Sequence, residues 1–258
     1  METTPLSQRE IRRYGKQIML PGIGTEGQSK LKKASVLVVG AGGLGCPVLQ
    51  YLTAAGTGRL GIIEFDKVDE SNLQRQVLYG TNDVGKLKSV IVRERLEYLN
   101  SLVSLEILNL RLDSSNALRI TRDYDLVVDA TDNIETRYVI NDSCVILGKP
   151  MVYGAIYKYE GQVAVFNYEN GPTYRCFNPF SPGKKYTNPL PSEVGLMGVL
   201  PGITGTCMAN EVIKIITGAG TVLSGKVLFF NTVTNSFRLI SVKNIPSNHN
   251  LSSIGQIV

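Results

Sequence analysis

The sequence predicts an α/β fold, a Rossmann-like, doubly wound, mostly parallel sheet that antiparallel strands continue on the C-terminal side. Short strands rich in Val, Leu and Ile alternate with helical segments through residues 35–150, as in parallel sheets covered on both faces. A glycine-rich turn joins the first of these strands to a helix. After Pro150 apolar and polar residues alternate, which is typical of antiparallel hairpins.

Length and composition predict a single domain, since 258 residues with 43% hydrophobic side chains can bury one large core. No continuous apolar run approaches the roughly 20 residues that cross a bilayer, so no membrane association is expected. The net charge of +5 is spread over scattered basic pairs, and no nucleic-acid partner is expected. The four cysteines form no Cys-x-x-Cys pair, which predicts a reducing, cytoplasmic compartment without disulfides.

The elements follow in chain order. Helices are expected over residues 7–19, 44–55, 86–99, 114–122, 135–147 and about 198–217, and strands over 35–39, 59–65, 103–108, 125–129, 226–231 and 236–242. Ser7 and Glu10 have the spacing of a capping box, and Gly218 ends the last helix. A hairpin is expected to turn at Glu160-Gly161. The proline-rich residues 171–191 predict an irregular crossing segment, and the polar tail after residue 243 is expected to be loosely held.

The glycine turn predicts a nucleotide site. Gly40, Gly42 and Gly45 form G-x-G-x-x-G, with Gly43 inside it, between a buried strand and a helix whose N-terminal amides attract an anion. The acidic pair Glu64 and Asp66 closes the next strand, about 20 residues on, where ribose hydroxyls are bound. A purely structural glycine turn is the alternative.

The segment after the second strand favours phosphate chemistry over hydride transfer. The only histidine, His249, lies in the polar tail, so no histidine is placed to handle a proton beside a nicotinamide. Two motifs instead supply amides and cations that suit a triphosphate and departing pyrophosphate. They are "DESNLQRQ", with Asn72, Gln74, Arg75 and Gln76, and "GKLK", with Lys86 and Lys88. Lys86 is better explained as an ordinary surface cation.

The motif "DATDN" ends the strand at residues 125–129 on the same edge of the predicted sheet. A carboxylate facing a polyphosphate is repelled unless a metal bridges the charges, so Asp132 is expected to bind Mg²⁺. The alternative is that Asp132 or Asn133 only caps the next helix. Asn133 is nevertheless counted among the nucleotide-binding candidates.

In this order and spacing, "GAGGLG", "SNLQRQ", "VGKLK" and "DATDN" closely resemble the ThiF, MoeB and HesA family of adenylyltransferases that activate ubiquitin-like proteins. The resemblance runs from "RRYGKQIMLPGIGTEGQSKL" to "GKVLFFN", essentially to residue 242. It implies that the glycine turn holds ATP, that Glu64 binds the ribose, that Asn72, Arg75 and Lys88 contact phosphates, and that Asp132 holds Mg²⁺. It also implies that the C-terminal glycine carboxylate of a carrier attacks the α-phosphorus of ATP.

The resemblance further implies a homodimer in which an N-terminal arginine reaches the neighbour's ATP. Lys16 stands at that position, and Arg13 lies close by in the sequence. A lysine delivers a charge but lacks the bidentate geometry of arginine.

Three departures from the family pattern concern cysteine. Relatives commonly bind zinc through two Cys-x-x-Cys pairs, but here the first pair is reduced to Thr173 and Cys176, and the second, around "IPSNHNLS", has no cysteine. Zinc is therefore not expected. Pro191 stands where some relatives have a reactive cysteine in the crossing segment. Cys176 is most simply explained as a leftover thiol, and Cys46, Cys144 and Cys207 as packed core residues.

The sequence thus predicts ATP- and Mg²⁺-dependent adenylation of a ubiquitin-like sulfur carrier ending in Gly-Gly, in thiamin or molybdopterin synthesis, with a ThiS-like carrier slightly favoured over a MoaD-like one. The parts would be a helical arm (1–34), a nucleotide-binding half (35–150), a partner-docking half (151–242) with its crossing segment (about 171–197), and the tail (243–258). The alternatives are an ATP-dependent tRNA-modifying relative, an NAD enzyme, or a non-catalytic nucleotide-binding scaffold.

Overall fold

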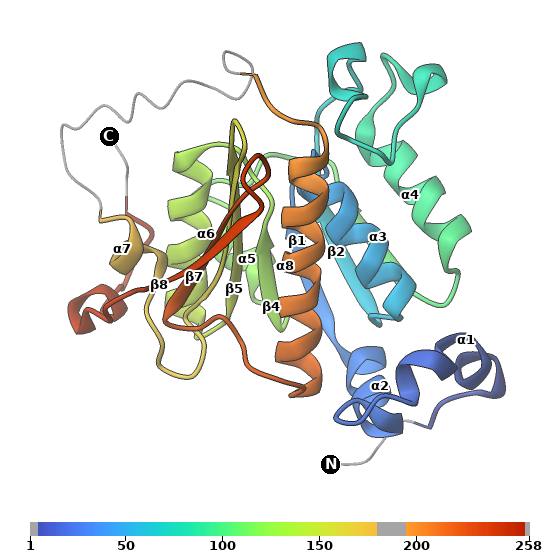
Figure 1. Cartoon of the computed structure of the whole chain (residues 1–258), viewed down its shortest axis with the longest axis horizontal. Coiled ribbons are helices and arrows are strands. Elements are labelled where there is room, and N and C mark those ends of the chain that lie inside the picture. Colours follow the sequence, from blue (N-terminus) through green and yellow to red (C-terminus); the bar gives the residue numbers. More distant parts are fainter. Residues whose placement is uncertain (1–4, 180–194, 256–258) are drawn as a thin grey trace.

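The computed structural model describes residues 5–179 and 195–255. Its strands form one eight-stranded sheet in the order β3-β2-β1-β4-β5-β6-β7-β8 (Figure 1). Strands β1 to β5 pair in parallel, with Val36 of β1 beside Leu60 of β2, and β5 to β8 pair antiparallel. The expected fold class is confirmed, including the continuation of the parallel sheet by antiparallel strands.

The strands match the expected ranges to within a few residues. They are β1 (Ser35–Val39), β2 (Arg59–Ile63), β3 (Ser104–Leu108), β4 (Leu126–Asp129), β5 (Met151–Tyr157), β6 (Glu160–Phe166), β7 (Lys226–Asn231) and β8 (Ser236–Ser241). The expected hairpin turn at Glu160-Gly161 is wrong, because Glu160 pairs with Tyr157 and the turn lies at residues 158–159. Gly161 belongs to the strand, where a Cβ would lie 2.3 Å from the ring of Phe230.

The helices are α1 (Gln8–Ile18), α2 (Gly24–Lys33), α3 (Gly45–Ala55), α4 (Lys88–Leu99), α5 (Ala117–Thr121), α6 (Ile134–Leu147), α7 (Tyr174–Phe177) and α8 (Val199–Thr217), with 3₁₀ turns η1 (Glu70–Asn72), η2 (Thr81–Asp83) and η3 (Pro246–His249). The capping box of Ser7 and Glu10 is confirmed, as is the left-handed Gly218 after α8. Helix α2 was not expected, because its glycines and lysines form no clear apolar face. Its Gln28 donates to the carbonyl of Ala55, so it is held by packing at the far end of α3.

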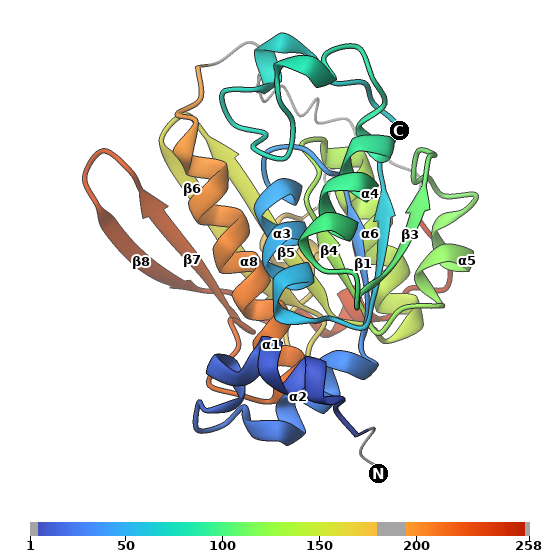
Figure 2. The same ribbon diagram turned by 90° about the vertical axis from the view of Figure 1, so that its right-hand side faces the viewer.

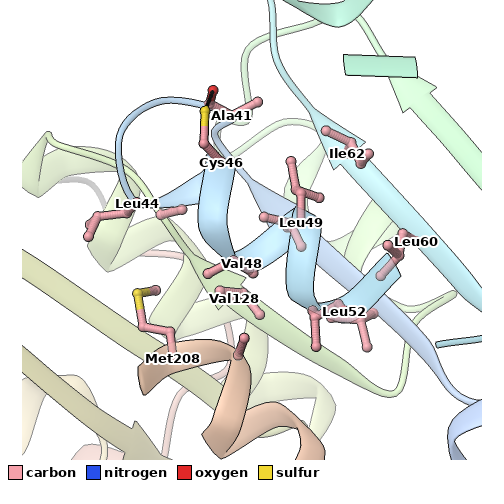
Figure 3. Close-up of a cluster of buried hydrophobic side chains, with 14 of the residues drawn as sticks. Ala41, Leu44, Cys46, Val48, Leu49, Leu52, Leu60, Ile62, Val128 and Met208 are labelled. Atoms are coloured by element: carbon pink, nitrogen blue, oxygen red, sulfur yellow. Dashed lines mark hydrogen bonds between the residues drawn. The ribbon is translucent and has the colours of Figure 1, made fainter. Parts of the chain in front are cut away.

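Helices cover both faces of the sheet (Figure 2). On one face α3, α4 and α8 enclose a core with β1, β2 and β4, and on the other α5, α6 and α7 enclose a second core. Figure 3 shows Leu49 and Leu52 of α3 in the first core with Leu60, Ile62 and Val128 of the strands. This packing fixes α3, and therefore the glycine turn at its start, against the sheet.

Helix α8 is, within the described ranges, the one helix whose length and composition would allow it to cross a membrane. Its sequence contains no long continuous apolar run, because Glu211 and Lys214 interrupt it. In the fold it packs on α3, β5 and β6. A Cβ on Gly205 would lie 2.4 Å from the carbonyl oxygen of Leu44, so α8 approaches the start of α3 very closely.

The polar tail is not loosely held over the part that the structure describes, contrary to expectation. The Sγ of Cys176 accepts hydrogen bonds from the backbone N–H of Ile245 at 3.4 Å and from Nδ2 of Asn248 at 3.5 Å. The N–H of Gly255 donates to Oδ2 of the fully buried Asp142 at 3.0 Å. The tail therefore packs on α6 and α7. Pro191 and most of the crossing segment, residues 180–194, lie outside the described residues.

Candidate nucleotide-binding site

The candidate site lies where β1, β2 and β4 end. Their last residues lead directly into Gly40, Glu64 and Ala130, which places all three connecting segments at one edge of the sheet. The strand order reverses between β1 and β4, and in open α/β sheets ligands bind in the crevice at such a reversal. The expected clustering of the glycine turn, the acidic pair and the "DATDN" motif is therefore found.

The glycine turn has a backbone that only glycine permits at two positions. Gly40 has a φ of +95°, and a Cβ there would lie 2.9 Å from the carbonyl oxygen of Ala130. A Cβ on Gly45 would lie 2.0 Å from the carbonyl oxygen of Gly40. Gly42, by contrast, has only the Nε2 of Gln76 within reach, at 3.7 Å from such a Cβ. At Gly42 the turn thus stays open for close approach by a phosphate.

Glu64 is buried, and its carboxylate organises the turn. Its Oε2 accepts from the N–H of Ala41 at 2.9 Å, and its Oε1 accepts from the N–H groups of Phe65 and Asp66, both at 2.8 Å. Oε1 already accepts two hydrogen bonds, so Oε2 is the oxygen with a further lone pair for a hydroxyl donor. The ribose contact of Glu64 stays a prediction, and the structure adds a second role that the sequence did not indicate.

The η1 segment brings the amide and arginine candidates beside the turn. Nη1 of Arg75 donates to the carbonyl of Ser71 at 3.0 Å, and the Cγ of Arg75 lies 3.6 Å from a Cβ built on Gly43. Gln76 is buried, and its Oε1 has no hydrogen-bond partner among the described residues. Its backbone N–H donates to the carbonyl of Asn72. The unpaired atom is an acceptor, which a hydroxyl or amino donor of a bound nucleotide can satisfy.

Lys88 is the first residue of α4 and is only 4% exposed. Its Nζ lies 3.5 Å from Oδ2 of Asp66, and its backbone N–H donates to the carbonyl of Asp66. A buried ammonium is costly unless it meets negative charge, so it needs Asp66 or a bound anion. Lys86 is exposed and lies 3.7 Å from Asp83, consistent with a surface cation.

Asp132 and Asn133 differ in what their side chains do. Oδ1 of Asn133 accepts from the N–H of Thr136 at 2.8 Å, so Asn133 caps α6, as the alternative interpretation held. Asp132 is exposed and makes no hydrogen bond or ion pair within residues 5–179 and 195–255. Those residues contain no group of three or more His, Cys, Asp and Glu side chains that could hold a metal. One free carboxylate suits Mg²⁺, which takes one or two protein carboxylates together with substrate phosphates.

A buried ion pair behind this loop was missed by the sequence analysis. Asp129, the last residue of β4, is fully buried, and its Oδ2 lies 3.6 Å from Nε of Arg137 on α6. Burial raises the pKa of Asp129, and the guanidinium of Arg137 opposes that rise. The available signal was an arginine four residues after the capping Asn133, on the first turn of the following helix.

Lys16 is the one candidate catalytic residue that the fold does not bring to this site. It lies on α1, which packs with α2 at the C-terminal end of α3, where Gln17 and Gln28 both donate to the carbonyl of Ala55 (Figure 1). The glycine turn is at the opposite end of α3, and a helix of 11 residues is about 16 Å long. Within one chain Lys16 therefore faces the wrong end of the molecule.

The cysteines on this side are not placed as nucleophiles. Cys46 is buried, and burial raises its pKa to about 12, as expected for a packed residue. Cys207 is half-buried rather than in the core, and it lines a hollow of about 780 Å³ between α8, the start of α3 and residues 74–77. Arg75 lines the same hollow.

The residues around Cys176 do not fit the zinc site that the family resemblance implies. Its partners are the hydroxyl of Thr173, the amide of Asn248, the side chain of Asn244 and a backbone N–H. Zinc in proteins is bound by thiolates, imidazoles and carboxylates. Here the sulfur is instead the centre of a hydrogen-bonded cluster.

Residues 14–251 match the ThiF family. The chain belongs to the ThiF family. It is 51% identical, over 93% of its length and 90% of the relative's, to a sulfur carrier protein adenylyltransferase of Thermus thermophilus. It is 47% identical to a probable molybdopterin-synthase adenylyltransferase of Porphyra purpurea and 46% identical to the adenylyltransferase and sulfurtransferase MOCS3 of Xenopus laevis. The chain spans 63% and 52% of these two longer relatives.

Solved structures agree on the fold. E. coli MccB in complex with ATP superposes with a TM-score of 0.79 over 98% of the chain and 75% of MccB, at 21% identity. E. coli MccB with MccA-N7isoASN gives a TM-score of 0.81 over 97% of the chain and 76% of MccB, at 22% identity. The named relatives identify the chain as an adenylyltransferase of the ThiF family. Its architecture resembles that of MccB.

Proposed function

We propose that this protein uses ATP and Mg²⁺ to adenylate the C-terminal glycine carboxylate of a ubiquitin-like sulfur carrier, releasing pyrophosphate. The observation that carries the proposal is the convergence of the open glycine turn, Arg75, Lys88 and the free Asp132 at one edge of the sheet. The 51% identity to a sulfur carrier protein adenylyltransferase supports the choice of substrate.

The proposed reaction needs no nucleophile from the protein. An oxygen of the carrier's ionised carboxylate forms a bond to the α-phosphorus of ATP, and the bond from that phosphorus to the bridging oxygen breaks. The electron pair leaves on pyrophosphate, and an acyl-adenylate remains. The chain contributes position and charge: the turn and η1 hold the triphosphate, while Arg75 and Lys88 offset the developing charge. Mg²⁺ held by Asp132 would neutralise phosphate charge as pyrophosphate departs.

We propose the outer antiparallel strands as the carrier's docking surface. On β8, Phe237 is 65% exposed and Leu239 is 58% exposed, and both point to the same face. The ring of Phe237 stacks on that of Phe230 at 5.8 Å between centroids. Contiguous exposed apolar side chains at the edge of a sheet are typical of protein interfaces. A small globular carrier placed there would extend its flexible C-terminus toward the edge with the glycine turn.

We propose that the enzyme acts as a homodimer. The position of Lys16 at the far end of α3 means that it serves this reaction only if a second copy brings it to the first copy's nucleotide. The arm exposes Ile11, Met19 and Leu20, and the hollow beside Arg75 exposes Val77 and Val199. Burial of both apolar surfaces in a twofold pair would place a cation near each nucleotide.

The experiment that tests the function is ATP–pyrophosphate exchange with Mg²⁺ and, in turn, a ThiS-like or a MoaD-like carrier. We expect exchange that requires one carrier and its terminal glycine, which also decides between thiamin and molybdopterin synthesis. A carrier truncated by its last residue is the matched control. Exchange without any carrier, or none with either, contradicts the proposal.

A further inference from the structure

The loop at residues 130–133, between β4 and α6, lies directly against the glycine turn. The N–H of Ala130 donates to the carbonyl of Val39 at 3.0 Å, which continues the pairing of β4 with β1 by one residue. A Cβ on Gly40 would lie 2.9 Å from the carbonyl oxygen of Ala130. The position of this loop therefore sets the position of Asp132 relative to the turn.

The side chain of Asp132 makes no hydrogen bond among the described residues, but the residues before and after it are both hydrogen-bonded. Both the N–H and the Oγ1 of Thr131 donate to Oδ1 of Asp129, at 3.0 and 2.6 Å. Asn133 caps α6 through the N–H of Thr136. The loop thus has one anchor at the end of the strand and another at the start of the helix.

Arg137 joins these two anchors. Its Nη2 donates to the carbonyl of Thr131 at 2.8 Å, and its Nε lies 3.6 Å from Oδ2 of Asp129. Its guanidinium carbon lies 5.2 Å above the ring of Tyr153 on β5, and the side chain is only 12% exposed. A single side chain therefore contacts the loop, the end of β4 and the neighbouring strand.

This arrangement contributes little to stability. Oδ2 of Asp129 and Nε of Arg137 have no hydrogen-bond partner among the described residues. Burying two charges costs more than a loosely paired geometry returns. Because the pair of Asp129 and Arg137 adds little stability, its presence needs another explanation. The hydrogen bond from Arg137 to the carbonyl of Thr131 supplies one, since it fixes the loop.

We propose that Arg137 is the residue that positions Asp132, by clamping the Thr131 carbonyl against the buried carboxylate of Asp129. The inference rests on the proposed function in one respect, the assignment of Asp132 to Mg²⁺. Arg137 itself touches neither substrate nor metal, and acts by restricting the loop that carries the ligand.

The test compares Arg137→Met, Arg137→Lys and the control Arg119→Met, which removes an exposed arginine of α5. ATP binding is measured by calorimetry with and without Mg²⁺, and hydrogen exchange is followed in the peptide that contains residues 130–134. In Arg137→Met we expect ATP affinity without Mg²⁺ within about twofold of wild type, loss of the extra affinity that Mg²⁺ confers, and faster exchange in the loop. Pyrophosphate exchange should fall about 10- to 100-fold.

Arg137→Lys keeps the charge and one donor, so it should recover part of the Mg²⁺-dependent binding. Arg119→Met should behave as wild type. The proposal is overturned if Arg137→Met keeps the full Mg²⁺ effect and the slow exchange of the loop, or if it loses ATP affinity equally with and without Mg²⁺. If the wild type binds ATP in a Mg²⁺-dependent way but no carrier supports pyrophosphate exchange, the proposed reaction fails, and the binding data still decide the role of Arg137.

Discussion

Oε2 of Glu64 accepts a hydrogen bond from the backbone N–H of Ala41 at 2.9 Å, so a carboxylate at the end of β2 holds the glycine turn that follows β1. Its other oxygen accepts from the N–H groups of Phe65 and Asp66. One buried side chain therefore shapes the phosphate-binding turn and the acidic segment together. This explains why an acidic residue is needed there before any ribose is bound.

Replacing Glu64 by Gln is expected to weaken ATP binding by about tenfold or more, because hydrogen bonds to a charged group contribute about 1.5–3 kcal/mol and one amide partner is lost. The fold should survive, since the side chain keeps its size. The dissociation constant for ATP, measured by calorimetry, checks this. Glu64→Asp keeps the charge with a shorter reach and is the matched control, expected between the two. Unchanged affinity in Glu64→Gln would show that the turn is rigid without the carboxylate.

The parallel half of the fold was predictable because its signals are local. The strand at 35–39, the glycine turn and the helix after it follow from apolar runs and from backbone geometry that only glycine adopts. Helix α2 and the hairpin turn were missed because their causes are not local. Gly161 is a glycine because Phe230, far along the chain, lies against it, and a glycine in a sequence pattern does not reveal whether it bends the chain or makes room.

The sequence could predict which polar residues lie near the glycine turn where a motif directly follows a strand, as with Arg75, Lys88 and Asp132, whose roles stay predictions. The sequence could not predict a residue that acts by positioning another residue, as we propose for Arg137 and Asp132. The place of Arg137 on the first turn of α6 could be read from its spacing after Asn133, but its pairing with Asp129 arises only when α6 packs beside β4. The sequence offered either Asp132 or Asn133 as the cap of α6, and the hydrogen bond from the N–H of Thr136 shows that it is Asn133.

Asp132→Ala is expected to leave stability within about 0.5 kcal/mol of wild type, because the side chain is exposed and unpaired among the described residues. Pyrophosphate exchange should fall by at least about 100-fold, because phosphate charge is no longer neutralised. Thermal unfolding and the exchange assay, run on the same preparation, measure both effects. Glu94→Gln on α4 removes another exposed carboxylate and should change neither quantity. Near-normal exchange in Asp132→Ala would remove the metal assignment.

Cysteine reactivity should follow burial and hydrogen bonding. Burial acts to raise the pKa of Cys176, but hydrogen bonds from Thr173, Asn248 and the N–H of Ile245 together lower it below its ordinary value. The thiolate is the reactive form, so alkylation of Cys176 should rise at a lower pH than that of a free thiol. Cys46, with its pKa raised to about 12, should stay unmodified through this range. Iodoacetamide labelling at a series of pH values, read by peptide mass spectrometry, checks the order. Faster labelling of Cys207 would contradict it.

The C-terminal tail, as far as the structure describes it, is expected to stay packed on α6 and α7 when metal ions are removed. Asp142 accepts from Nε and Nη2 of Arg175, at 2.8 and 2.7 Å, and from the N–H of Gly255. Removing one partner of a buried ion pair costs about 3–5 kcal/mol, so Asp142→Asn should lower stability by that order and expose the tail to protease. EDTA should change neither the melting temperature nor tail cleavage in the wild-type protein. A drop in melting temperature with EDTA that zinc reverses would show that the cluster around Cys176 is a metal site after all.

The placement of Lys16 leads to a complementation test of the dimer. If each site combines Asp132 of one chain with Lys16 of the other, Lys16→Ala and Asp132→Ala should each be inactive as homodimers. In a mixed dimer both substitutions fall in the same site, and the other site is entirely wild type. Random assembly of equal amounts makes half of the dimers mixed, so co-expression should restore about a quarter of wild-type exchange activity. Two affinity tags allow the mixed dimer to be purified and assayed alone, where about half of wild-type activity is expected. No recovery in the purified mixed dimer would mean that Lys16 acts within its own chain, which the distance along α3 allows only if the arm moves. A fully active Lys16→Ala homodimer would mean that Lys16 takes no part in the reaction.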